Sequence, residues 1–147
     1  MIFGLLKTAA ISIARPLVQF IGFVQLVRSQ RRMRYDIRAA RGIALLREWL
    51  SHEQRAQFDA FKCFDVTGSK SGKRYRIQHG LSANVHELDD ADHPVMGWCF
   101  VPAGNLVPGD IMLAQKIALE TNESGALSVA RKFLAPPVPS RTATIRN

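Results

Sequence analysis

The first 41 residues divide into a nearly continuous apolar stretch, residues 2–27, and a cluster of arginines that follows it directly. Small or polar residues recur within the apolar stretch every three or four positions, which indicates one narrow polar stripe along a helix. The remaining helix surface is apolar and too wide to be left in water. Something must therefore cover it, and the sequence allows the rest of the chain, a partner chain or a membrane.

The positive charge of the chain is concentrated in this N-terminal arm, residues 1–41, and just beyond it. Residues 1–48 hold nine of the 20 lysines and arginines but only two of the 12 acidic residues, so they carry seven of the eight net positive charges. An apolar helix with a basic end is typical of a helix lying at an anionic leaflet. The arm residues expected to face a membrane or a partner protein are Phe3, Leu6, Leu17, Phe20, Phe23, Arg28, Arg31 and Arg32.

Two alternatives to membrane association stay open at this point. The arm could be a helix packed on the rest of the chain with a solvated basic end, or translation could begin at Met33. A spanning helix is disfavoured, because Arg15 and Pro16 lie near the middle of the apolar stretch. A secretory signal is disfavoured too, because the basic cluster follows the apolar run. We therefore expect a cytoplasmic protein that the arm could bring to the membrane face.

Residues 42–135 are predicted to form one α+β domain, a four-stranded antiparallel meander flanked by helices. Helical periodicity continues over residues 33–49, and Ser51 and Gln54 have the spacing of a capping box that begins a helix ending near Phe61. Short alternating or apolar runs between turn signals predict the strands Cys63–Val66, Lys73–Gln78, Asn84–Leu88 and Val95–Val101. The last of these is apolar on both faces, which indicates a central or covered strand.

Two further helices and a tail are expected after the meander. Asp110 is expected to be the N-cap of a helix that runs to about Thr121. A last helix is predicted to begin near Ala126 and to carry Phe133 and Leu134. The proline-rich residues 136–147 are expected to form a disordered tail.

Four stretches of this region follow a shared pattern, namely Gly72–Ile77 (GKRYRI), Asn84-Val85 (NV), Trp98–Pro102 (WCF-P) and Gly109–Glu120 (GD-MLAQKIALE). With them, the chain from about Leu45 to Phe133 resembles a group of small bacterial proteins that have no established activity. The resemblance implies one common folding unit and leaves the N-terminal arm outside it. It implies no site residues.

No sequence motif of a known chemistry is present in the chain. The two cysteines and four histidines lack the spacings of metal sites, and neither a phosphate-binding glycine loop nor a hydrolase nucleophile motif occurs. We therefore predict no metal and no cofactor. The anion-binding candidates are Lys73, Arg74 and Arg76, a basic strand that could meet phosphate or carboxylate. The alternative is a salt-bridged face with Glu87 and Asp65 as partners.

These features favour a non-enzymatic accessory or binding protein that associates with a membrane surface or a partner through its arm. An enzyme is disfavoured, because no acid, base and nucleophile group together by spacing. The second hypothesis is a nucleic-acid-binding protein that uses the basic arm and the basic hairpin. A steep fall of affinity with salt would be the sign of that function.

Overall fold

The computed structural model describes residues 2–100 and 103–134, with side chains from residue 19 onward, and shows an α+β chain. Its elements in chain order are α1 (Ile2–Trp49), α2 (His52–Phe61), β1 (Cys63–Thr67), β2 (Arg74–Gln78), β3 (Val85–Leu88), β4 (Pro94–Cys99), α3 (Pro108–Val129) and β5 (Arg131–Phe133). The chain divides into two compact units, Met1–Arg38 and Ala39–Asn147, so α1 contributes residues to both. The sheet, α2 and α3 belong to the second unit.

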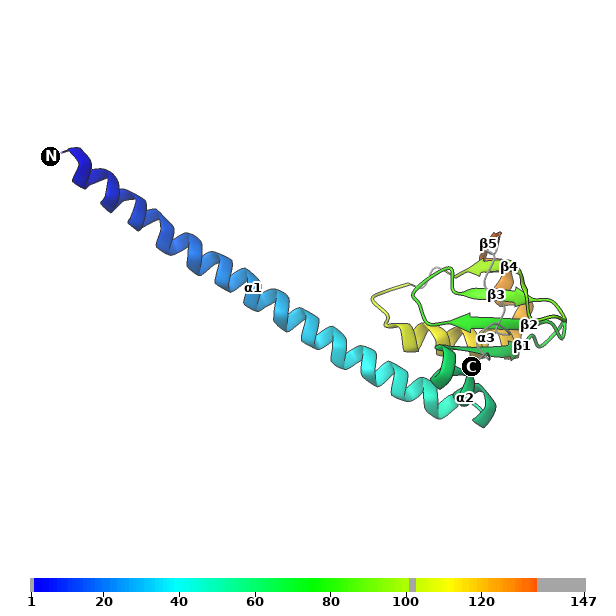
Figure 1. Ribbon diagram of the computed structural model, residues 1–147. Coiled ribbons are helices and arrows are strands. Elements are labelled where there is room, and N and C mark those ends of the chain that lie inside the picture. The colour runs from blue at the N-terminus through cyan, green and yellow to red at the C-terminus, as the bar shows by residue number, and fades with distance from the viewer. Residues whose placement is uncertain (1, 101–102, 135–147) are drawn as a thin grey trace, which may run out of the picture. The chain divides into compact units, whose positions relative to one another are not determined.

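The five strands form one antiparallel sheet in the order β1-β2-β3-β4-β5, so each strand pairs with the next one along the chain. Figure 1 shows α3 along one face of this sheet. The antiparallel meander agrees with the sequence prediction, whereas the number of strands is five rather than four. Because β5 pairs with β4, the strand that is apolar on both faces has a neighbour on each side.

The hydrophobic core lies between α3 and the face of the sheet that it covers, and the end of α1 and α2 complete it. The strand register brings core residues together, since Phe64 lies opposite Ile77 and Val66 lies opposite Tyr75. The buried members of the core are Leu46, Leu50, Phe58, Phe64, Val66, Tyr75, Ile77, Val85, Trp98, Met112, Leu113, Leu119 and Ala126. All of them belong to the second unit.

The short helix α2 begins as the sequence predicts. The Gln54 backbone N–H donates a hydrogen bond to the Ser51 hydroxyl at 3.1 Å, and the Ser51 N–H donates one to the Gln54 side chain at 3.2 Å. These reciprocal bonds are the predicted capping box and satisfy two backbone donors at the helix start. At the other end, Lys62 adopts a left-handed backbone conformation (φ 55°) and the chain then enters β1.

Two glycines of the second unit allow α1 and α3 to touch at the backbone. A Cβ atom at Gly109 would overlap the backbone of Gly42 and Ile43. A Cβ atom at Gly42 would lie 2.7 Å from the side chain of Val107. Only residues without a side chain permit so close an approach, so Gly42 is a packing position and not simply a weak point of its helix.

The prediction of the last helix is wrong at its C-terminal end, because Arg131–Phe133 form the strand β5. The helix stops at Val129, and Ala130 already has an extended backbone. The Phe133 ring packs on Gly97, where a Cβ atom would overlap it, and stands edge-on to His86 with ring centroids 5.8 Å apart. Tertiary packing of Phe133 therefore overrides the local helical periodicity.

The start of α3 also differs from the prediction. The helix begins at Pro108 with Val107 as its N-cap, so Asp110 lies in the first turn and not at the cap. Proline suits the first helical position, because its fixed φ fits the helix and its missing N–H is not needed there. The helices predicted before and after residues 122–125 are joined in α3, and the predicted break between them is present as a kink at Asn122, whose backbone is non-helical (φ −147°, ψ 62°).

Some sequence predictions fall outside the described part of the chain. These are the tail at 136–147, Val101 at the end of the fourth predicted strand, and the side chains of Phe3, Leu6 and Leu17. Among the helices as far as they are described, none combines the length and the hydropathy needed to cross a membrane.

The close crossing of α1 and α3 leads to the prediction that Gly109→Ala is destabilising. The added methyl group must push two backbones apart, and overpacking of this kind typically costs about 1–3 kcal/mol of unfolding free energy. Gly22→Ala is the matched control, because a Cβ atom at Gly22 meets nothing within 4 Å. Chemical denaturation measures the difference, and a Gly109→Ala protein as stable as the control would contradict the crossing.

A chain that begins at Met33 is expected to keep the fold of the second unit. The core begins at Leu46 and the glycine crossing at Gly42, so the shortened chain retains both. It should also be more soluble, because it lacks the apolar stretch of the arm. Thermal unfolding and size-exclusion chromatography test this expectation. Aggregation of the shortened chain beside a monomeric full chain would show that residues 1–32 are part of the core.

Candidate functional site

Arg76, one of the three anion-binding candidates, is a buried partner in a salt bridge. It lies opposite Asp65 in the register of β1 and β2 and is only 6% exposed. Its Nε and Nη2 atoms donate to the two Asp65 oxygens at 2.8 and 2.9 Å. The hydrogen bonds to Asp65 raise the pKa of the guanidinium. This bidentate pairing occupies the N–H groups with which an arginine binds carboxylates and phosphates.

The other two candidates, Lys73 and Arg74, also meet oxygen acceptors. The Lys73 ammonium pairs with Glu87 on β3, and the hydrogen bond to Glu87 raises the pKa of Lys73. The Arg74 guanidinium pairs with Asp92 and donates to the backbone oxygen of Asp89 at 2.6 Å. The basic strand is thus salt-bridged. Two of its partners, Asp65 and Glu87, are the carboxylates that the alternative interpretation of the sequence named.

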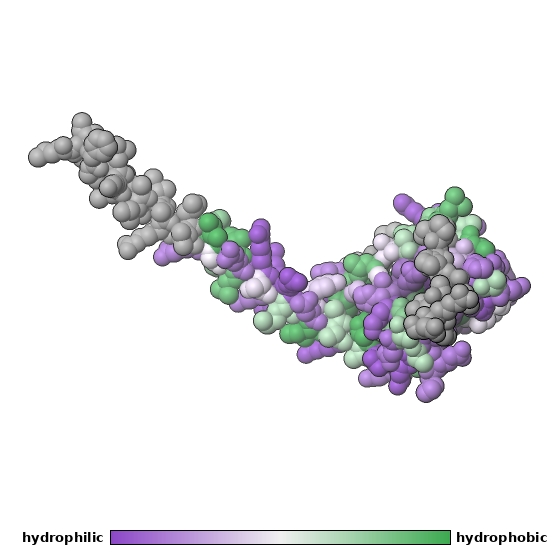
Figure 2. Space-filling model, viewed as in Figure 1, coloured by the Kyte–Doolittle hydropathy of each residue, from purple (hydrophilic) through white to green (hydrophobic). Residues whose placement is uncertain are grey.

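The candidate arm residues with described side chains are Phe20, Phe23, Arg28, Arg31 and Arg32, and all are exposed. Phe20 exposes 65% of its surface and Phe23 64%. Figure 2 shows apolar side chains interleaved with hydrophilic ones along the described part of α1. The first unit therefore presents apolar surface and positive charge on the same short length of helix.

Glu123 on α3 is a buried carboxylate that the sequence analysis does not single out. It is 3% exposed and accepts four hydrogen bonds. The donors are the backbone N–H groups of Lys70 (2.8 Å) and Ser71 (2.7 Å), the Ser71 hydroxyl and the Tyr75 hydroxyl (2.7 Å). The Glu123 N–H donates in turn to the Ser69 hydroxyl at 3.1 Å. These bonds tie the turn between β1 and β2 to α3.

The same donors hold Glu123 in its ionised form. Burial alone would raise the pKa of its carboxyl group, but the hydrogen bonds from Ser71 and Tyr75 outweigh burial and lower the pKa from 4.5 to about 2. Burial and the bond to Glu123 also raise the pKa of the Tyr75 hydroxyl. A carboxylate that is ionised and fully hydrogen-bonded suits a structural anchor better than a proton donor.

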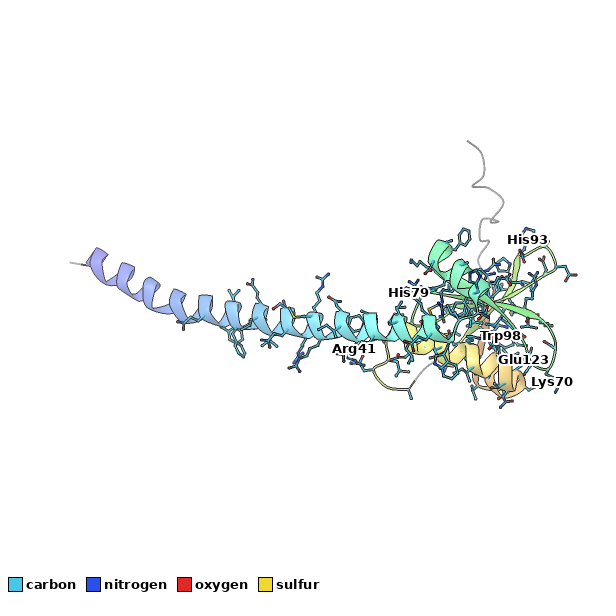
Figure 3. The ribbon with its side chains drawn as sticks, turned by 90° about the horizontal axis from the view of Figure 1, so that it is seen from below. Arg41, Lys70, His79, His93, Trp98 and Glu123 are labelled. Carbon is cyan, nitrogen blue, oxygen red and sulfur yellow. The ribbon has the colours of Figure 1, made fainter. Side chains whose placement is uncertain are left out.

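The surface beside this anchor is hollowed, with a volume of about 630 Å³. We call it the Trp98 hollow, because Trp98 of β4 lines it with Met96 and Leu127 while being only 6% exposed. The Lys132 ammonium lies 4.9 Å from the centre of the Trp98 ring. Figure 3 shows Lys70, Trp98 and Glu123 near one another in the second unit, and all three line the hollow.

Another buried polar side chain, His86, lies on the opposite face of the sheet. It is 3% exposed, and its Nδ1 atom has no hydrogen-bond partner in the part of the chain that is described. Burial, followed by the nearby positive charge of Arg76, lowers the pKa of this imidazole. Among the described residues, no three His, Cys, Asp or Glu side chains come together as metal ligands. His86 packs edge-on against Phe133, and its burial disfavours the charged form.

The sequence does contain a signal for Glu123, although none for the rest of the hollow. Leu119 lies four residues before Glu123 and Ala126 three residues after it, and both are buried core residues. An acidic residue within an apolar helical stripe needs buried hydrogen-bond donors. Trp98 and Lys132 carry no comparable signal, because the pairing of β4 with β5 brings them together.

Glu123→Gln is predicted to destabilise the protein and to flatten its response to acid. An amide offers one acceptor oxygen, so buried donors lose their partner at a cost of about 1–3 kcal/mol. The carboxyl group titrates at 4.5 when unfolded and at about 2 when folded, so its stabilisation is present above pH 4.5 and lost as the pH falls toward 2.

Denaturation midpoints measured across this pH range test the prediction. The same substitution at Glu53, whose side chain is exposed, is the control for the loss of one carboxylate and should leave the protein about as stable as the natural chain. An acid dependence as steep in Glu123→Gln as in the natural chain would contradict the role of the carboxylate.

The comparisons with known proteins add no further constraint on this geometry. No family model matches the chain, and neither a curated protein nor a solved structure shows significant similarity to it. Any functional assignment therefore depends on the residues themselves.

Proposed function

We propose that this chain is a non-enzymatic accessory or binding protein that its N-terminal arm holds at an anionic membrane surface. The observation that carries the proposal is the exposed apolar surface of the first unit. Phe20, Phe23 and Leu26 are 65%, 64% and 55% exposed, and Ile21 is 48% exposed. Soluble proteins rarely leave so many large apolar side chains together in water without a partner.

The charge that follows this apolar surface favours an anionic membrane as the partner. Arginines occur at six positions directly after it, namely Arg28, Arg31, Arg32, Arg34, Arg38 and Arg41, and all six are exposed. Near an anionic leaflet each such residue contributes about 1 kcal/mol of attraction. The apolar side chains would enter the boundary between headgroups and acyl chains while the arginines remain at the headgroups.

The second unit fits the role of a recognition module better than that of an enzyme. Its buried carboxylate, Glu123, is held ionised by four donors and is committed to the fold. His86 is buried on the opposite face of the sheet, against Phe133. His86 is therefore remote from the Trp98 hollow, and Glu123, although it lines the hollow, is held ionised and is poorly suited to give a proton to a substrate there.

Nucleic acid is the second candidate partner, because the same arginines would attract a phosphate backbone. The basic hairpin gives this candidate little support, since Lys73, Arg74 and Arg76 are already engaged by carboxylates. The exposed phenylalanines of the arm have no role in simple phosphate binding. We therefore favour the membrane surface.

The proposal predicts that the full chain floats with vesicles of mixed phosphatidylcholine and phosphatidylserine and much less with phosphatidylcholine alone. Arg28→Gln combined with Arg31→Gln and Arg32→Gln should weaken partitioning about a hundredfold, since three charges are removed. Phe20→Gln with Phe23→Gln should weaken binding to both kinds of vesicle.

The matched control removes three exposed charges from the second unit, through Arg55→Gln, Lys62→Gln and Arg131→Gln, and should partition as the natural chain does. Equal losses in both triple variants would show that net charge alone is responsible. Full-length protein that stays with the supernatant of anionic vesicles would overturn the proposal. Retention on DNA or RNA that falls steeply with salt would then favour the nucleic-acid alternative.

A further inference from the structure

The Trp98 hollow has the size and the mixed lining of a small-molecule site. Its volume of about 630 Å³ falls within the range typical of ligand pockets, roughly 300–1,000 Å³. Its residues come from four separate places in the chain, which are the turn after β1, strands β2 to β4, the end of α3, and β5. Such a composite wall exists only in the folded second unit.

One side of the hollow is apolar and includes an aromatic ring. Trp98, Met96 and Leu127 line it, and Val95 at its edge is 49% exposed. The Lys132 ammonium lies over the Trp98 ring at 4.9 Å from its centroid. This side therefore suits the flat or apolar body of a ligand, with a positive charge directly above it.

The charges around the hollow leave two ammonium groups available to a ligand. Lys73 and Glu87 pair with each other, and the oxygens of Glu123 are occupied by four donors. Lys70 and Lys132 are exposed, and within the described residues neither ammonium pairs with a carboxylate. The charge that a ligand meets here is therefore positive.

The Trp98 indole also carries a polar donor that lies within the fold. Its Nε1 atom is buried and has no acceptor among the described residues. A buried N–H without an acceptor is uncommon and is satisfied by an oxygen of a water or of a ligand. Because the indole N–H is buried, we assign the polar contacts of a ligand to the two exposed ammonium groups of the lining.

We propose that the Trp98 hollow binds a small amphipathic anion, with an apolar or aromatic body against its apolar lining and a phosphate or carboxylate group drawn by the ammonium groups of Lys70 and Lys132. This inference does not depend on membrane association, because every residue that carries it belongs to the second unit. It supplies the recognition module with a ligand class.

Two other hollows among the described residues of the second unit are less suited to a ligand. The polar one, of about 550 Å³, includes Asp65 and Glu120, which already pair with Arg76 and Lys116. The apolar one, of about 270 Å³ beside Phe100, has no charged side chain among the described residues of its lining to orient a ligand.

Fluorescence of Trp98 in the full chain tests the proposal. Trp49→Phe leaves Trp98 as the one tryptophan, and Trp49 is 58% exposed, so its replacement spares the core. Phenyl phosphate is the first probe, and its binding should change the Trp98 emission in a saturable way. Three control compounds should bind at least about tenfold more weakly. Inorganic phosphate lacks the aromatic body, benzyl alcohol lacks the charge, and benzyltrimethylammonium carries a positive charge instead of a negative one.

Two sets of variants locate the binding. Lys70→Gln with Lys132→Gln should weaken phenyl phosphate binding about tenfold, and Ser124→Phe, which fills the hollow, should abolish it. Lys62→Gln with Arg131→Gln removes the same charge outside the hollow and should leave the affinity unchanged. Thermal unfolding of each variant confirms that its fold is kept, and calorimetry provides a second measure of affinity.

A water-soluble short-chain phosphatidic acid is the last probe and separates two sources of the same chemistry. Tighter binding of this lipid than of phenyl phosphate would assign the hollow to a lipid headgroup, and the reverse order to a soluble ligand. Either order supports an anion site. The proposal would be overturned if no anionic probe gave a saturable signal, or if benzyltrimethylammonium bound more tightly than phenyl phosphate. It would also be overturned if Lys70→Gln with Lys132→Gln and the control Lys62→Gln with Arg131→Gln lost the same affinity.

Discussion

Glu123 places an ionised carboxylate inside a packed domain, where a charge without partners would cost several kcal/mol. The cost is offset because Lys70, Ser71 and Tyr75 supply four donors from the β1–β2 hairpin. The turn and the first strands are thereby held against the last third of α3. The lining of the Trp98 hollow depends on this tie, since Lys70 and Ser71 belong to the turn that Glu123 holds.

The other wall of the hollow depends on a second tertiary contact, the packing of Phe133 on Gly97. Because Gly97 has no side chain, the ring lies directly on β4, and its other neighbour is His86. This contact holds the short strand β5 against β4 and brings Lys132 over Trp98. Helical periodicity up to residue 134 therefore gives way to an edge strand, which brings to the hollow a second ammonium group that pairs with no carboxylate of the described residues.

The salt bridges of Lys73, Arg74 and Arg76 change which part of the chain is available to an anion. A basic strand predicted as a candidate anion site has Asp65, Glu87 and Asp92 as neighbours, so its charges are met within the sheet. Lys70 and Lys132 at the hollow, and the arginines of the arm, are the cationic groups that the proposals use. We thus propose membrane attraction for the arm and ligand binding for the Trp98 hollow, each with its own apolar surface and its own positive charge.

Much of the fold could be predicted from the sequence, because its signals are local. The capping box at Ser51 and Gln54, the alternation that buries Tyr75 and Ile77, and the helical stripe of α3 each depend on residues a few positions apart. The segregation of the apolar and basic parts of the arm is also a property of the sequence itself.

The candidate site was decided by the tertiary structure, because its members lie far apart in the chain. Glu123 lies 52 residues from Ser71 and 48 from Tyr75, and no local pattern records which donors a buried carboxylate will meet. The fifth strand and the contact of Gly42 with Gly109 belong to the same class, since each depends on the shape of a distant surface. Local periodicity determines which face of an element is buried, whereas only packing determines what it is buried against.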